Sequence, residues 1–141
     1  MATINPYLNF RGNTEEVFNF YKSVFGGEFI VVSRFKDVPN SGMPPEDGDK
    51  LMHISLPIGD NILMGSDAIG VMGKDYSQGT NFSLSITPAS NEEAEKIYNG
   101  LVAGGVVKMP LEKTFWAEAF GMLIDKFGIH WMINYEGSQQ Q

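Results

Sequence analysis

His53 is the side chain of this sequence that is best suited to proton transfer near neutral pH, where imidazole changes its charge. It lies between Met52 and Ile54 in an apolar segment. Side chains alternate between the two faces of a strand, so His53 and Ser55 would face away from Met52 and Ile54. If those two pack beneath a helix, His53 would bind an anion or move a proton on the open face. The alternative is a structural histidine bonded to a neighbouring strand.

Carboxylates are a second class of acid–base candidates. Glu118 follows Trp116 in an aromatic segment, where partial burial would make its carboxyl a stronger proton acceptor. On the surface it would be an ordinary acid. Asp125 is another candidate base. The second histidine, His130, adjoins Trp131 near a predicted turn and is expected to be structural.

Amide and hydroxyl side chains occur at alternate positions of two short segments that have the period of a strand. These polar residues are Asn5, Tyr7, Asn9, Asn81, Ser83 and Ser85. Such groups orient a bound molecule by hydrogen bonds but supply little acid strength. The alternative is that the two polar sets meet at an interface between modules and satisfy one another.

Aromatic and methionine side chains near the second half of the chain are candidates for an apolar pocket wall. They include Phe115, Trp116, Phe120, Trp131 and Met132. Methionine adapts to irregular ligands, but it fills protein cores equally well. The alternative is therefore that these side chains form the core.

Two segments that would position these groups have the apolar spacing of an amphipathic helix. The first set is Val17, Phe20, Tyr21, Val24 and Phe25, and the second, in the same spacing, is Ala94, Ile97, Tyr98, Leu101 and Val102. Each is preceded by a predicted N-cap, Asn13 or Ser90, with a glutamate three residues later. Gly27 and Gly104 are predicted to end the two helices.

Each predicted helix has one strand before it and three strands after it. The following strands are predicted at 28–35, 51–56 and 61–66 in the first half, and at 106–111, 115–124 and 129–135 in the second. Two βαβββ modules in tandem predict an α+β fold.

The modules are predicted at about 3–67 and 80–136, joined by a linker at 68–79, within a single domain 1–141. Residues 37–49, rich in proline and glycine, form a long loop that is a candidate lid. Residues 139–141 are expected to be a frayed tail.

The composition and the absence of certain motifs argue against several classes of function. The net charge is −7 and no basic cluster is present, which disfavours nucleic-acid binding. There is no cysteine, no long apolar run and no signal-peptide pattern, so a cytoplasmic protein without a membrane partner is expected. Neither Gly-x-x-x-x-Gly-Lys-[Ser/Thr] nor Gly-x-Gly-x-x-Gly occurs, so no nucleotide or S-adenosylmethionine cofactor is expected.

Several stretches of the chain resemble one known family. They are Ile4-Asn5-Pro6-Tyr7-Leu8, Asn19-Phe20-Tyr21, Leu51-Met52-His53, Leu63-Met64-Gly65-Ser66-Asp67, and Asp125-Lys126-Phe127-Gly128 with Trp131. Over about residues 3–136 the sequence is similar to the PhnB-like branch of the vicinal oxygen chelate superfamily, which includes glyoxalase I, bleomycin-resistance proteins and extradiol dioxygenases. The resemblance implies that the sheets of two modules form a cup that holds a ligand, and that the protein is a homodimer.

The resemblance also implies where a metal would be bound in the metal enzymes of that superfamily. The matching positions are Asn5 and Asn81 on the first strand of each module, and positions near Leu63 and Met132 on the last strand. Two amides and two apolar side chains make a poor divalent site, because such cations prefer imidazole and carboxylate. We therefore expect no metal.

The leading hypothesis is a metal-independent protein that binds a small molecule in the cup, as bleomycin-resistance proteins do. The predicted ligand-binding residues are Asn5, Tyr7, Asn9, His53, Ser55, Asn81, Ser83, Trp116 and Met132. The alternative is a lyase or isomerase that uses His53 with Glu118, or a metal enzyme with other ligands. A third hypothesis is an interaction module without a ligand.

Overall fold

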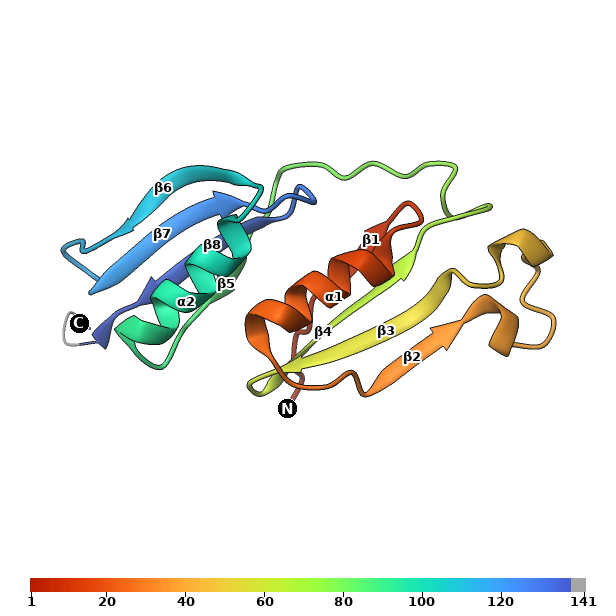
Figure 1. Ribbon diagram of the computed structural model, residues 1–141, viewed down its shortest axis with the longest axis horizontal. Helices are drawn as coiled ribbons and strands as arrows, with labels where there is room; N and C mark the ends of the chain where they lie inside the picture. Colours follow the sequence, from red (N-terminus) through yellow and green to blue (C-terminus); the bar gives the residue numbers. More distant parts are fainter. Residues whose placement is uncertain (138–141) are drawn as a thin grey trace. The chain divides into compact units, whose positions relative to one another are not determined.

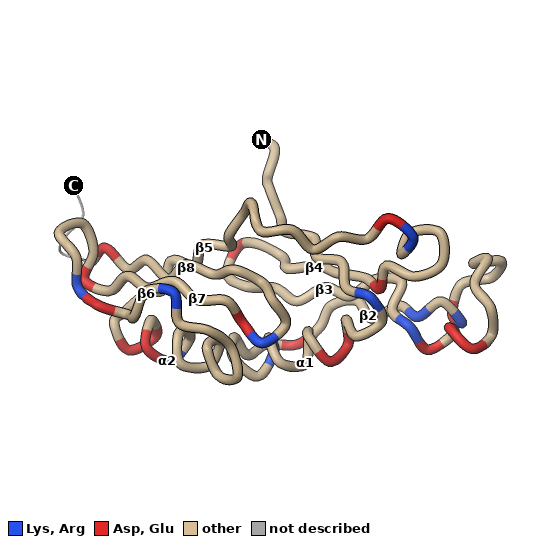
Figure 2. Tube along the Cα trace, turned by 90° about the horizontal axis from the view of Figure 1, so that it is seen from above, with Lys and Arg blue, Asp and Glu red and all other residues tan. Residues whose placement is uncertain are grey.

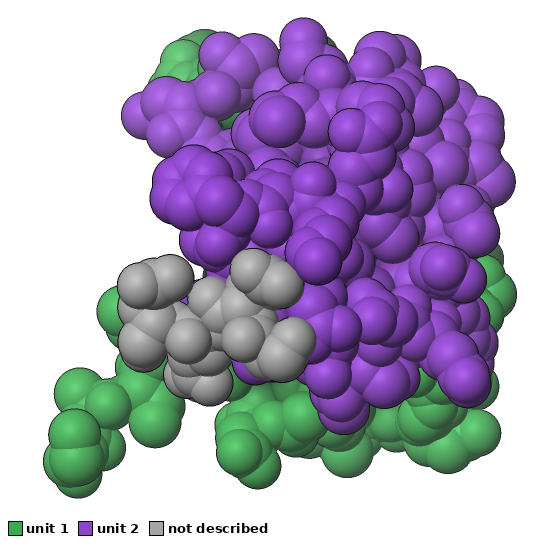
Figure 3. Space-filling model, turned by 90° about the vertical axis from the view of Figure 1, so that its left-hand side faces the viewer, with its two compact units in different colours: residues 1–78 green, residues 79–141 purple. Residues whose placement is uncertain are grey.

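The computed structural model describes residues 1–137, and these residues form two helices and eight strands (Figure 1). The chain divides into two compact units, residues 1–78 and the chain from residue 79 onward (Figure 3). The tail predicted at 139–141 lies outside the described residues.

The first unit follows the predicted order of one strand, one helix and three strands. Its elements are β1 (Tyr7–Phe10), α1 (Thr14–Phe25), β2 (Val31–Arg34), β3 (Leu51–Ile58) and β4 (Asn61–Asp67). The sheet order is β1-β4-β3-β2, with β1 parallel to β4 and the other pairs antiparallel.

The second unit repeats this scheme. Its elements are β5 (Leu84–Ile86), α2 (Asn91–Val102), β6 (Val106–Glu112), β7 (Ala119–Ile124) and β8 (His130–Tyr135). The sheet order is β5-β8-β7-β6, again with one parallel pair, β5 and β8. The predicted α+β fold of tandem βαβββ modules is thus confirmed.

The apolar faces of both helices are buried, as their spacing predicts. In α1 the side chains of Val17 and Tyr21 are fully buried, and in α2 those of Ala94 and Leu101. Alternate strand residues supply the other side of each core, such as Leu56 in β3. Each helix therefore covers one face of the sheet in its own unit, and the other face carries the remaining strand side chains.

Two strand glycines allow the helices to approach their sheets closely. A Cβ atom on Gly65 in β4 would lie 2.6 Å from Cε1 of Phe18, and one on Gly121 in β7 would lie 2.7 Å from Cε2 of Tyr98. These distances are too short for real contacts, so any larger residue would displace an aromatic ring of the helix.

The beginning of α2 is formed as predicted. Ser90 Oγ accepts a hydrogen bond from the Glu93 amide at 3.1 Å, while Glu93 Oε1 accepts one from the Ala89 amide at 2.8 Å. Figure 2 shows acidic residues at the beginning of both helices, where the helix dipole favours negative charge.

The prediction for the start of α1 was wrong in one respect. Asn13 is the N-cap residue but its side chain makes no capping bond. Instead the buried carboxylate of Asp67, at the end of β4, accepts hydrogen bonds from the amides of Thr14 at 3.0 Å and Leu51 at 2.7 Å. A residue distant in sequence thus replaces the local cap, because β4 ends beside the helix N-terminus.

Several segments predicted as strand begin later than expected, among them β2, which begins at Val31 instead of residue 28. β1 begins at Tyr7 and β5 at Leu84, so Asn5, Asn81 and Ser83 precede the ladders. β7 begins at Ala119, because Thr114 Oγ1 accepts hydrogen bonds from the amides of the two residues before Glu118. That side chain stabilises a turn in place of the first part of the strand.

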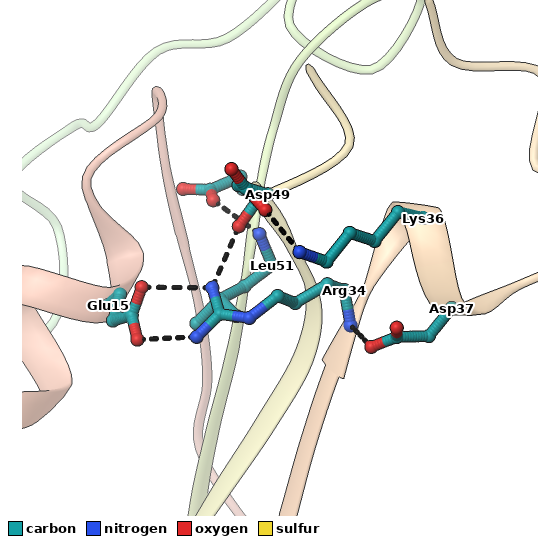
Figure 4. A network of polar contacts seen from close by, with 7 residues as sticks. Glu15, Arg34, Lys36, Asp37, Asp49 and Leu51 are labelled. Atoms are coloured by element: carbon teal, nitrogen blue, oxygen red, sulfur yellow. Dashed lines mark hydrogen bonds and ion pairs between the residues drawn. The ribbon is translucent and has the colours of Figure 1, made fainter. Parts of the chain in front are cut away.

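Residues 37–49 follow a short 3-10 turn, Phe35–Asp37, contain a second one, Pro45–Asp47, and are fixed at their base by charged side chains (Figure 4). Arg34 donates to both carboxylate oxygens of Glu15 on α1, at 2.9 and 2.7 Å, and to the Asp49 carbonyl at 2.8 Å. Lys36 pairs with the Asp49 carboxylate at 2.7 Å. A lid function for this loop stays a prediction.

Neither helix among residues 1–137 has the length and apolar character that crossing a bilayer requires.

Candidate functional site

The helix-free face of the first sheet brings together three of the predicted site residues. Ile54 pairs with Gly65 beneath α1, so its neighbours in β3, His53 and Ser55, point to the opposite face. In the strand register Tyr7 pairs with Met64, and Met64 pairs with Ser55. Tyr7, Met64 and Ser55 therefore lie in one row across the sheet.

His53 lies between two hydroxyl groups. Tyr7 Oη is 3.1 Å from His53 Nδ1, and Ser55 Oγ is 2.8 Å from His53 Nε2. The rings of Tyr7 and His53 are tilted by 41° with centroids 5.6 Å apart. Ser55 is 3% exposed, whereas Tyr7 is 44% exposed. We call these three residues the His53 cluster. It links a buried hydroxyl to an accessible one through an imidazole.

A second polar contact lies beside the His53 cluster. Ser66 in β4 donates a hydrogen bond to Asn9 Oδ1 at 3.1 Å, and the two residues are register partners. Asn9 was predicted as a site residue and Ser66 was not. Strand alternation is the signal that could have identified Ser66. It lies two residues after Met64 in β4, so its side chain points to the same face as Met64 and away from that of Leu63 and Gly65.

Asn5 has a structural role in the first unit. Its Oδ1 atom accepts hydrogen bonds from the Ile62 amide at 2.9 Å and from Asn61 Nδ2 at 3.4 Å, while Asn61 Nδ2 also donates to the Ile4 carbonyl at 2.8 Å. These bonds extend the contact between the start of β1 and the start of β4. The amide oxygen of Asn5 is thereby occupied.

The helix-free face of the second sheet is less polar. Met132 in β8 pairs with Ser85 and Met122, and Met122 pairs with Met109. Trp116 contacts Phe120 and Phe115 edge to face, with ring centroids 5.2 and 4.9 Å apart. Asn81 and Ser83 are exposed ahead of β5.

The two carboxylates that the sequence suggested as bases have partners within the second unit. Glu118 Oε1 accepts a hydrogen bond from Asn91 Nδ2 at 3.0 Å. Asp125 is buried and accepts bonds from the Phe127 amide and from Trp131 Nε1, both at 2.8 Å. Asp125 therefore stabilises the turn between β7 and β8 and the indole beside it.

The residues at the metal positions that the sequence resemblance implies do not fit a divalent cation. Asn5 and Asn81 offer only neutral amides, and Leu63 and Met132 offer no hard ligand. Among residues 1–137 there is no group of three or more histidine, aspartate or glutamate side chains placed to hold an ion.

Comparisons with known proteins agree with this architecture. Residues 2–134 match the family model described as 3-demethylubiquinone-9 3-methyltransferase. The chain belongs to this family. A relative, protein YjdN of Escherichia coli, is 30% identical over 140 residues, which cover 93% of each chain.

Solved structures extend the family assignment to the fold. Protein PA1353 from Pseudomonas aeruginosa is 40% identical with a TM-score of 0.84, and the match covers 96% of this chain and 98% of that one. A Bacillus cereus structure described as a putative 3-demethylubiquinone-9 3-methyltransferase, PhnB protein, is 26% identical with a TM-score of 0.75 and coverage of 95% and 99%. The resemblance to PhnB-like proteins is confirmed.

A more distant likeness concerns the fold alone. A Burkholderia phytofirmans enzyme of the glyoxalase/bleomycin resistance/dioxygenase family is 18% identical with a TM-score of 0.62, and the match covers 92% of this chain and 96% of that one. The protein whose sequence is printed above therefore has the glyoxalase-like fold. The family's description names a methyltransferase, but this chain has no Gly-x-Gly-x-x-Gly loop of the type that binds S-adenosylmethionine.

Proposed function

We propose that this PhnB-like protein binds a small molecule on the helix-free face of its first sheet, at the His53 cluster, without a catalytic metal. The observation that supports the proposal is the position of His53 between the Tyr7 hydroxyl at 3.1 Å and the Ser55 hydroxyl at 2.8 Å. A row of hydrogen-bonding side chains on a rigid sheet fixes the orientation of a ligand at little entropic cost.

The chemistry of this face supports a ligand in preference to a structural role alone. His53 is bonded to a hydroxyl on each side, and one of these, on Tyr7, belongs to a side chain that is 44% exposed and thus accessible to a ligand. Asn9 and Ser66 add an amide and a hydroxyl to the same face. Charged side chains of this unit such as Arg34 and Asp67 are engaged with the helix side of the sheet.

The test is a thermal-shift screen of a fragment library against the wild type and two histidine variants. We expect ligands that stabilise the wild type to lose their effect in H53A and to retain it in H130A. His130 is the matched control because it is the other histidine, located in the second unit. A ligand present at 100 times its Kd adds about 2.7 kcal/mol to the stability of a folded protein.

The proposal is contradicted if no fragment stabilises the wild type, or if every stabilising fragment acts equally on H53A. The first outcome would favour the interaction-module hypothesis from the sequence, and the second would favour a binding site away from His53.

A second candidate function is proton transfer by His53 in a metal-independent lyase or isomerase. The observation that favours it is the contact between His53 Nδ1 and the exposed Tyr7 hydroxyl at 3.1 Å, which gives a proton a path between a ligand and the imidazole. H53A separates the two functions once a reactive ligand is found: a binding protein loses affinity, whereas an enzyme retains affinity and loses turnover.

A further inference from the structure

The hydrogen bonds of the His53 cluster can run in one of two directions. A neutral imidazole has one N–H donor and one bare acceptor nitrogen. Either Tyr7 donates to Nδ1 while the Nε2 hydrogen points to Ser55, or Ser55 donates to Nε2 while the Nδ1 hydrogen points to Tyr7. The burial of the two hydroxyls distinguishes these arrangements.

The Ser55 hydroxyl needs His53 as its acceptor. Ser55 is only 3% exposed, and within the described part of the chain its Oγ atom is bonded to His53 Nε2. If Nε2 carried the hydrogen, the Ser55 hydrogen would be buried without an acceptor, which proteins avoid. Ser55 therefore donates to Nε2, and the ring hydrogen of His53 is on Nδ1.

This tautomer determines what Tyr7 offers. With the hydrogen on Nδ1, His53 donates to Tyr7 Oη at 3.1 Å, and the phenol hydrogen is left to point elsewhere. Tyr7 is 44% exposed, so that hydrogen is directed to solvent or to a ligand. Hydrogen bonds in such a chain polarise one another, which strengthens the terminal donor.

We propose that Ser55, His53 and Tyr7 form a directed hydrogen-bond relay that presents the Tyr7 hydroxyl as a donor to a carbonyl or carboxylate oxygen of the ligand. This inference rests on the proposed binding function and names the chemical class that the site accepts. Tyr7 contacts the ligand, and Ser55 is a positioning residue that acts through His53.

The first experiment needs no ligand. Long-range 1H–15N correlation spectra of the labelled protein, recorded at about pH 8 where histidines are ordinarily neutral, report which ring nitrogen carries the hydrogen. We expect the Nδ1–H tautomer for His53 in the wild type and in the control S33A, and a shift towards Nε2–H in S55A. Ser33 is the control because it is the cross-strand partner of His53 on β2. An Nε2–H tautomer in the wild type overturns the relay.

The second experiment uses three probes of similar size in NMR titrations: benzoate, acetophenone and benzylammonium. Benzoate and acetophenone offer a carboxylate and a carbonyl acceptor, whereas benzylammonium offers only donors. We expect at least one acceptor probe to shift the NMR signals of Tyr7 and His53. The affinity for that probe should fall about tenfold in Y7F, which is the scale of one hydrogen bond to a charged group. The comparison of benzoate with acetophenone identifies the preferred acceptor.

The net charge of −7 by itself would favour the cation benzylammonium over the acceptor probes. A preference for an acceptor probe would therefore reflect the site and not the overall charge. A response to benzylammonium alone, or no response to either acceptor probe, overturns the relay. The proposed binding function is judged separately by the fragment screen, so fragments that act through His53 without an acceptor oxygen would retain that function and reject the relay.

Discussion

At the scale of single residues, buried polar groups in this protein differ in whether their hydrogen-bonding capacity is used. Asp67 and Asp125 are almost fully buried, and each accepts bonds from backbone amides or an indole. Ser55 is bonded to His53. Thr14, at the start of α1, is fully buried, yet its hydroxyl has no partner among the described residues. Such a group costs free energy that an apolar replacement would recover.

We therefore expect T14V to leave stability unchanged or to raise it by up to about 1 kcal/mol, since valine keeps the shape and removes the unpaired hydroxyl. T14S is the matched control, because it keeps the hydroxyl and removes a buried methyl, which should cost about 1 kcal/mol. Urea denaturation measures both changes. A larger loss in T14V than in T14S would show that the hydroxyl has a partner.

At the scale of elements, the close contact between α1 and β4 depends on Gly65. G65A should lower the free energy of unfolding by about 1–3 kcal/mol, because the new methyl overlaps Cε1 of Phe18 and lies 3.0 Å from the Leu8 carbonyl. The double variant G65A/F18L tests the cause, since a smaller side chain on the helix leaves room for the methyl. We expect G65A to cost less in the F18L background, and equal costs in both backgrounds would refute the steric explanation.

The contact between α1 and β2 predicts a pH-dependent contribution to stability. The hydrogen bond from the Arg34 guanidinium lowers the pKa of the Glu15 carboxyl below its ordinary value of 4.5. A lowered pKa means that the folded state favours the charged form, so the contribution is complete above pH 4.5 and is lost as the pH falls through the folded-state pKa. Both side chains are partly exposed, which limits the effect to about 1 kcal/mol.

We expect E15Q to be less stable than the wild type at neutral pH and this difference to shrink below about pH 4.5 in chemical denaturation curves. E16Q removes the same charge from the same helix turn without removing a partner of Arg34, so it controls for the helix dipole. A difference between E15Q and the wild type that stays constant with pH would contradict the role assigned to this ion pair.

At the scale of the whole molecule, family membership and the repeated architecture agree. Two units with the same order of elements and the same strand order follow from two copies of one amphipathic pattern. The family match over residues 2–134 spans both units. The enclosed cup, the homodimer and the cytoplasmic location stay predictions.

The sequence by itself determined the number, order and type of the elements, because these depend on apolar periodicity and on local signals such as Ser90 with Glu93. It also indicated that His53 and Ser55 share one face of their strand and that Tyr7 belongs to the polar face of another, since strand alternation is a local property.

Only the tertiary structure decided which of these groups touch. The bond between Asp67 and the start of α1 and the contact between His53 and Tyr7 each depend on strand register. Register is set by the packing of whole sheets beneath helices, for example Gly65 under Phe18, and no local sequence pattern encodes a contact between residues so far apart in the chain.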